Sequence, residues 1–136
     1  MQYERDTLTI EEVLNTAPEV WEAVMDASHY DIKPGDSFFI KENPNKAFFI
    51  EGLEKGRGVT YSGGKLIGDD DIIPLFSTGA MINIMGIHNQ FEVRSAGVNW
   101  IALFDGEQVY KSDEEELLVS FLWKVLKDLS IQKKLI

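Results

Sequence analysis

A chain of 136 residues with 44% hydrophobic residues is long and apolar enough to bury the core of one domain. Its formal net charge of -10 would repel nucleic acid, because phosphate contacts require local positive charge. The absence of cysteine excludes disulfides and cysteine-ligated zinc. We therefore expect a single domain over residues 1–136 that does not bind nucleic acid directly.

The sequence shows no targeting or membrane signal. The first ten residues, MQYERDTLTI, contain no apolar run typical of a signal peptide. No later stretch approaches the roughly 20 apolar residues of a membrane span. We expect a cytoplasmic protein, in a bacterium or in an infected host cell, with no membrane partner.

Two helices are expected near the N-terminus. Thr9 is followed three residues later by Glu12, a capping-box pattern that predicts a short helix over residues 8–15. Thr16 and Glu19 repeat the pattern. A second helix is therefore predicted directly after the first.

The next apolar residues follow the spacing of strands. The runs DSFFIKE and KAFFIEG, joined by the turn residues 42–45, predict a hairpin in which Lys41 lies opposite Lys46. Both faces of this hairpin are partly apolar. It is therefore either covered on both sides or leaves aromatic surface for a partner.

A second hairpin is expected where residues 57–62 and 65–67 flank Gly63 and Gly64. The sequence GDDD at residues 68–71 then interrupts the strand pattern. We interpret this segment as an exposed loop and as the best candidate for a subdomain boundary.

The C-terminal half has the clearest pattern. The predicted elements are a short edge strand or an extended lead-in at residues 72–76, a helix at 78–86, strands at 91–94, 98–104 and 108–110, and a closing helix at 113–129. Asp105 and Gly106 form a strong hairpin signal between the last two strands. The predicted fold class is α+β, with an antiparallel sheet, or two small sheets, covered by three to four helices.

The order helix, strand, strand, strand, helix within residues 72–136 resembles the double-stranded RNA-binding domain. The strand VNWIALF, with Trp100, and the leucine-rich closing helix also make this half similar to small uncharacterised proteins of phages and mobile elements. In the RNA-binding family, basic residues at the start of the last helix contact phosphates. Here residues 113–116 are all acidic, so the resemblance implies the layout without RNA binding.

The acidic run before the closing helix has two explanations. Ser112 and Glu115 fit a capping box, and acidic residues in a first turn face the helix dipole favourably. This structural role explains most of the run. The alternative is a surface that docks on a basic partner protein, formed by Asp105, Glu107, Asp113, Glu114 and Glu116.

The stretch GLEKGRGVTYSGGK, residues 52–65, is the one place where flexible backbone amides and positive charge occur together. It lacks the phosphate-loop signature, and turn formation alone explains its glycines. As a site for a small anion or nucleotide it would use Lys55, Arg57, Gly63, Gly64 and Lys65.

Catalytic and metal-binding patterns are weak. His29 and His88 could share a metal ion, but both directly follow predicted helices, where polar residues commonly satisfy terminal carbonyls. No nucleophile motif is present. We expect no metal, no cofactor and no catalytic residue.

The preferred function is a non-catalytic inhibitor or accessory factor, of a phage or mobile element, that occupies a basic site on another protein. The alternative is a protein that binds or sequesters a small ligand.

Overall fold

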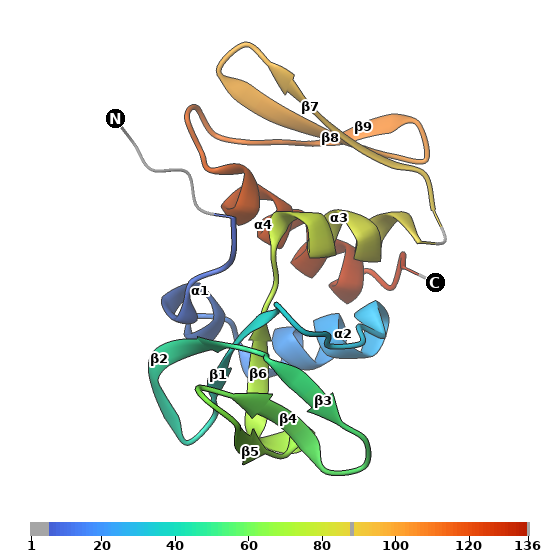
Figure 1. Cartoon of the computed structure of the whole chain (residues 1–136). Coiled ribbons are helices and arrows are strands. Elements are labelled where there is room, and N and C mark those ends of the chain that lie inside the picture. Colours follow the sequence, from blue (N-terminus) through green and yellow to red (C-terminus); the bar gives the residue numbers. More distant parts are fainter. Residues whose placement is uncertain (1–5, 88, 136) are drawn as a thin grey trace. The chain divides into compact units, whose positions relative to one another are not determined.

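The structure, a computed structural model, describes residues 6–87 and 89–135 (Figure 1). Within these residues the chain forms four α-helices, one 3-10 helix and three antiparallel sheets of three strands each. The α+β fold class predicted from the sequence is therefore confirmed. The contacts divide the chain into two compact units. Unit 1 contains residues 6, 16–30 and 78–135, and unit 2 contains residues 7–15 and 31–77.

Unit 2 carries one short α-helix, one 3-10 helix and two sheets. Its elements are α1 (Ile10–Leu14), β1 (Ser37–Ile40), β2 (Asn43–Phe49), β3 (Gly52–Glu54), β4 (Gly58–Tyr61), β5 (Lys65–Ile67), the 3-10 helix Asp69–Asp71 and β6 (Ile72–Leu75). The strand orders are β2-β1-β6 and β3-β4-β5. The second predicted hairpin, β4–β5, and the edge position of β6 are both confirmed.

The capping box that begins α1 is confirmed. The Thr9 hydroxyl accepts a hydrogen bond from Glu12 N at 3.1 Å, and the Glu12 carboxylate accepts one from Thr9 N at 2.9 Å. Two backbone donors that the helix itself leaves unpaired are thus satisfied by this reciprocal pair.

The β1–β2 hairpin forms, but in a register one residue away from the predicted one. Lys41 was expected opposite Lys46, whereas Phe39 pairs with Ala47. The register shifts after Phe39, and Ile40 pairs with the first residue of β2, which begins inside the predicted turn. The alternation of apolar residues along the two strands does not predict this register shift.

The core of unit 2 lies beside β1. Phe38 packs against Phe48 and Tyr61, with ring centroids 5.8 Å and 5.5 Å apart. Phe38 and its neighbour Phe39 are both buried, so strand β1 is covered on both faces. Phe49 on β2 is 68% exposed. Strand β1 is therefore covered, whereas β2 leaves Phe49 exposed, and a partner for this aromatic surface stays a prediction.

The predicted boundary at residues 68–71 lies inside unit 2, and the chain enters unit 1 after Ser77. The exposed aspartates of this segment form the 3-10 helix. That the whole chain acts as one domain stays a prediction.

Unit 1 contains the predicted order α3-β7-β8-β9-α4, together with one earlier helix. Its elements are α2 (Pro18–Ser28), α3 (Thr78–Gly86), β7 (Phe91–Ala96), β8 (Asn99–Phe104), β9 (Glu107–Lys111) and α4 (Leu118–Ile131). The strand order is β7-β8-β9. Figure 1 shows α3 and α4 on one side of this sheet.

Two local predictions for unit 1 have different outcomes. The hairpin at Asp105 and Gly106 is confirmed, and both residues have positive φ, at 53° and 86°, as a type I′ turn requires. The capping box at Thr16 and Glu19 is wrong. The N-cap of α2 is Ala17, which makes no side-chain cap hydrogen bond, and Pro18 occupies the first turn.

Helix α4 supplies most of the core of unit 1. Its buried residues follow helical spacing and are Val119, Phe121, Leu122, Trp123, Val125, Leu126, Leu129 and Ser130. Trp123 also packs against Trp21 of α2, with ring centroids 6.0 Å apart. On the sheet, Tyr110 of β9 donates a hydrogen bond to Asp128 of α4, which ties the strand to the helix.

None of the helices in residues 6–87 and 89–135 has the length and apolar content that crossing a membrane requires.

Candidate functional site

The acidic run predicted to begin α4 instead precedes it. Helix α4 begins at Leu118, and its N-cap is Leu117, which makes no side-chain cap hydrogen bond. Residues 113–116 form a turn, in which Glu115 adopts a positive φ of 56°. The prediction that these acids occupy the first turn of the helix is therefore wrong.

Ser112 has a different role from the predicted N-cap. It is only 5% exposed. Its hydroxyl accepts a hydrogen bond from Trp100 N at 2.7 Å and donates one to Asp113 O at 2.9 Å. The hydroxyl therefore bonds to the backbone of Trp100, which is distant in sequence, and does not cap the helix.

The five residues of the predicted acidic docking surface do not form one cluster. Asp105 and Glu107 lie at the β8–β9 hairpin. Glu115 N, in the acidic turn, bonds to Val98 O, immediately before β8 begins. The acidic turn and the hairpin therefore lie at opposite ends of β8 (Figure 1). A strand of six residues spans about 17 Å at the usual rise per residue.

Several of these carboxylates already have partners. Glu116 Oε2 lies 2.7 Å from Lys124 Nζ, and Asp113 Oδ2 lies 3.6 Å from the same nitrogen. The pKa of Lys124 is raised, first by its hydrogen bond with Glu116, although desolvation opposes the increase. Asp105 accepts a hydrogen bond from Gln90 N at 3.1 Å. A partner-binding role for Asp105, Glu107, Asp113, Glu114 and Glu116 stays a prediction.

The predicted anion-binding residues are also divided. Lys55 and Arg57 lie in the turn before β4, whereas Gly63, Gly64 and Lys65 follow that strand. The structure thus places the two groups at opposite ends of β4.

Of the two histidines, the structure describes only His29. His29 is the C-cap of α2, in the left-handed conformation that ends the helix, and is exposed. His88 lies outside the described residues. In the part of the chain that the structure describes, no three His, Cys, Asp or Glu side chains are grouped so that they could hold a metal ion.

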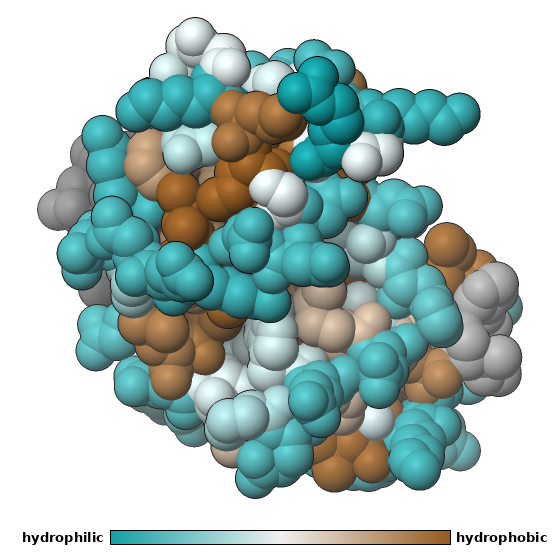
Figure 2. Space-filling model, turned by 90° about the horizontal axis from the view of Figure 1, so that it is seen from below, coloured by the Kyte–Doolittle hydropathy of each residue, from teal (hydrophilic) through white to brown (hydrophobic). Residues whose placement is uncertain are grey.

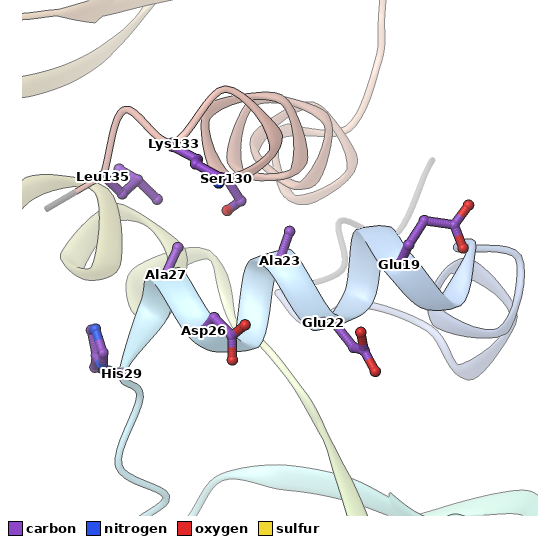
Figure 3. A pocket seen from close by; sticks show the side chains of 9 residues that line it. All are labelled: Glu19, Glu22, Ala23, Asp26, Ala27, His29, Ser130, Lys133 and Leu135. Carbon is purple, nitrogen blue, oxygen red and sulfur yellow. The ribbon is translucent and has the colours of Figure 1, made fainter.

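A cavity of about 410 Å³ lies in unit 1, between α2 and the C-terminal end of α4 (Figure 3). We call it the α2 pocket. It is lined by Glu19, Glu22, Ala23, Asp26, Ala27, His29, Ser130, Lys133 and Leu135.

Helical spacing and side-chain size produce the α2 pocket. Ala23 and Ala27 are one turn apart, so they share a face of α2, and their small side chains fill little space opposite α4. Figure 3 shows both alanines pointing toward the end of α4, while the carboxylates of Glu22 and Asp26 extend on the side away from it. The result is an apolar floor with a charged rim.

The rim of the α2 pocket is acidic. Among the lining residues that the structure describes, three are acidic, Glu19, Glu22 and Asp26, and one is a lysine, Lys133. None of these three carboxylates makes an ion pair or hydrogen bond with another of the described residues, unlike Glu116. In the sequence, acidic residues at positions 22 and 26 directly precede alanines at positions 23 and 27. This pattern could have indicated the site, but only a helix was predicted there.

Some large apolar side chains are exposed. On the face seen in Figure 2, they reach the surface in separate groups bordered by hydrophilic side chains. The large ones are Leu14, Phe49, Leu53, Leu66, Ile87, Val98, Val109 and Ile131. Single exposed apolar side chains are usual on protein surfaces.

Comparisons of the chain with protein-family models, with curated proteins and with solved structures find no match. A function must therefore follow from the geometry and charge of the site.

Proposed function

We propose that this protein is a non-catalytic interaction protein, an inhibitor or accessory factor, that binds a basic segment of a partner protein in the α2 pocket. The observation that carries the proposal is the cavity of about 410 Å³ with three carboxylates at its rim. This volume is at the lower end of the range of about 300–1,000 Å³ for ligand pockets. It suits one or two side chains rather than a large cofactor.

The lining of the α2 pocket suits the side chain of arginine or lysine. The methylene stem of such a side chain would pack on Ala23, Ala27 and Leu135. Its charged head would then lie near the edge of the pocket, where Glu22 and Asp26 are among the lining residues. Hydrogen bonds between ionised groups are about twice as strong as neutral ones, so the rim would supply specificity for a basic segment.

The acidic turn before α4 supports the same function less well. Lys124 neutralises part of its charge through Glu116 and Asp113. The remaining members of the predicted surface, Asp105 and Glu107, lie at the other end of β8. A partner would have to span the strand to use both groups.

The test is a binding titration with a defined probe, a short peptide of alternating arginine and glycine, followed by ¹⁵N NMR. The pocket variant is Glu22→Gln with Asp26→Asn, and the matched control is Glu107→Gln with Glu114→Gln. Both variants remove two negative charges, and all four residues are exposed. We expect salt-sensitive binding to the wild-type protein and a loss of about tenfold in the pocket variant.

The control variant separates the pocket from the net charge. We expect it to weaken binding by less than about twofold, since screening limits the effect of distant charges. Equal losses in the two variants would show that the peptide responds only to net charge. A loss confined to the control would move the docking surface to residues 105–116.

A further inference from the structure

The turn after β4 holds a carboxylate of the protein itself. Gly63 N donates hydrogen bonds to both oxygens of Glu51, each at 3.1 Å, and Gly64 N donates to Oε1, also at 3.1 Å. Three contacts from two neighbouring amides to one carboxylate are the arrangement of an anion-binding nest. The Glu51 side chain therefore occupies the position that a bound anion would take.

The backbone of this turn is shaped to present its amides. Ser62, Gly63 and Gly64 have positive φ values of 46°, 83° and 98°. Gly63 and Gly64 adopt such conformations without strain, and successive positive φ values turn the N–H groups toward one side. A Cβ placed on either glycine would meet no atom within 4 Å, so the space beside the turn is open.

Strand pairing brings Glu51 to this turn. Glu51 N donates to Thr60 O at 2.8 Å, and the next residue, Gly52, pairs with Thr60. Residue 51 therefore lies beside the end of β4, within reach of the turn that follows. Glu51 is exposed, so water and dissolved anions compete for the same amides.

We propose that the turn Ser62–Gly64 is a binding site for a small oxyanion, such as a phosphate group, and that Glu51 is its built-in competitor. Lys65 follows the turn directly and contributes positive charge. Lys55 and Arg57 take no part, because they lie at the other end of β4. The site belongs to unit 2 and is independent of the α2 pocket.

The test is a titration with inorganic phosphate at constant ionic strength, followed through the amide signals of Gly63 and Gly64 in ¹⁵N NMR. The variant Glu51→Ala removes the competitor. The matched control Glu54→Ala removes the same charge from an exposed residue of the neighbouring strand. We expect phosphate to bind Glu51→Ala about tenfold more tightly than the wild type, since the anion no longer has to displace a charged hydrogen-bond partner.

Two further results decide the proposal. Glu54→Ala should bind phosphate like the wild type, and an equal gain in both variants would mean that only net charge matters. Glu51→Gln keeps an acceptor oxygen and removes the charge, so it should bind phosphate with an intermediate affinity even if Glu51→Ala folds poorly. The absence of saturable shifts at Gly63 and Gly64 in both Glu51 variants would overturn the proposal.

Discussion

Glu116 Oε2 lies 2.7 Å from Lys124 Nζ, and this ion pair joins the acidic turn to the helix that follows it. The other oxygen of the same carboxylate accepts a hydrogen bond from Asp113 N at 3.0 Å. The Glu116 side chain is only 11% exposed. Among the four acids of the run, Glu116 thus has a structural role that its position in the sequence does not reveal.

We predict that Glu116→Gln lowers the free energy of unfolding by about 0.5–1 kcal/mol, because it weakens an ion pair at a partly exposed site. The control Glu114→Gln, at an exposed residue of the same turn, should change it by less than about 0.3 kcal/mol. Urea unfolding of the two variants measures the difference. Equal values for Glu114 and Glu116 would contradict the structural role.

The contribution of this ion pair should depend on pH. The pKa of Lys124 is raised above its ordinary value of 10.5, chiefly by the hydrogen bond to Glu116. For a group whose pKa is raised on folding, the stabilisation is complete below the unfolded pKa and is lost as the pH rises through the folded pKa. The difference between wild type and Glu116→Gln should therefore persist at neutral pH and shrink above pH 10.5. A difference that instead grew with alkaline pH would contradict this assignment.

Ser112 gives a second prediction, because its hydroxyl bonds to the backbone of β8. Ser112→Ala removes the acceptor of Trp100 N in a nearly buried place, which should cost about 1–3 kcal/mol. Amide hydrogen exchange at Trp100 should accelerate at the same time. The control is Ser95→Ala on β7. Ser95 is exposed, so this change should lower the free energy of unfolding by less than about 0.5 kcal/mol. If Ser112→Ala proved as mild as this control, the hydrogen bond to Trp100 would be unimportant.

The sequence predicted elements well where one local pattern determined them. The hairpin at Asp105 and Gly106 follows from the backbone angles of two residues, and the burial of α4 follows from its apolar spacing. The predicted start of α4 was wrong. Ser112 fits a capping pattern in the sequence, but in the structure its hydroxyl accepts a hydrogen bond from a distant backbone donor, Trp100 N. Local patterns do not show which of two such partners is closer in the folded chain.

The candidate sites were harder to predict, because they depend on which side chains meet. Asp105 and Glu116 are eleven positions apart in the sequence, yet β8 separates their turns. Glu51 and Gly63 are twelve positions apart and are hydrogen-bonded. The α2 pocket requires the end of α4 to lie opposite Ala23 and Ala27. Strand pairing and helix packing determine these distances, and neither can be read from spacing along the chain.

The last prediction concerns Gly58, where β4 passes close to β5. Gly58 is buried and has a φ of 131°, and a Cβ there would lie 2.0 Å from Ile67 O. Gly58→Ala therefore combines backbone strain with a clash against backbone that cannot move independently, and it should cost about 2–5 kcal/mol. Gly56→Ala is the matched control, because Gly56 also has a positive φ, of 76°, but a Cβ there would meet no atom within 4 Å. Its cost should be the backbone strain alone, about 1–2 kcal/mol. Urea unfolding of both variants measures the difference, and faster amide exchange in β5 should accompany Gly58→Ala. Equal losses of unfolding free energy in the two variants would contradict the prediction. They would mean that β4 and β5 move apart at no cost to make room for the Cβ, so that the close approach to Ile67 does not matter for the stability of unit 2.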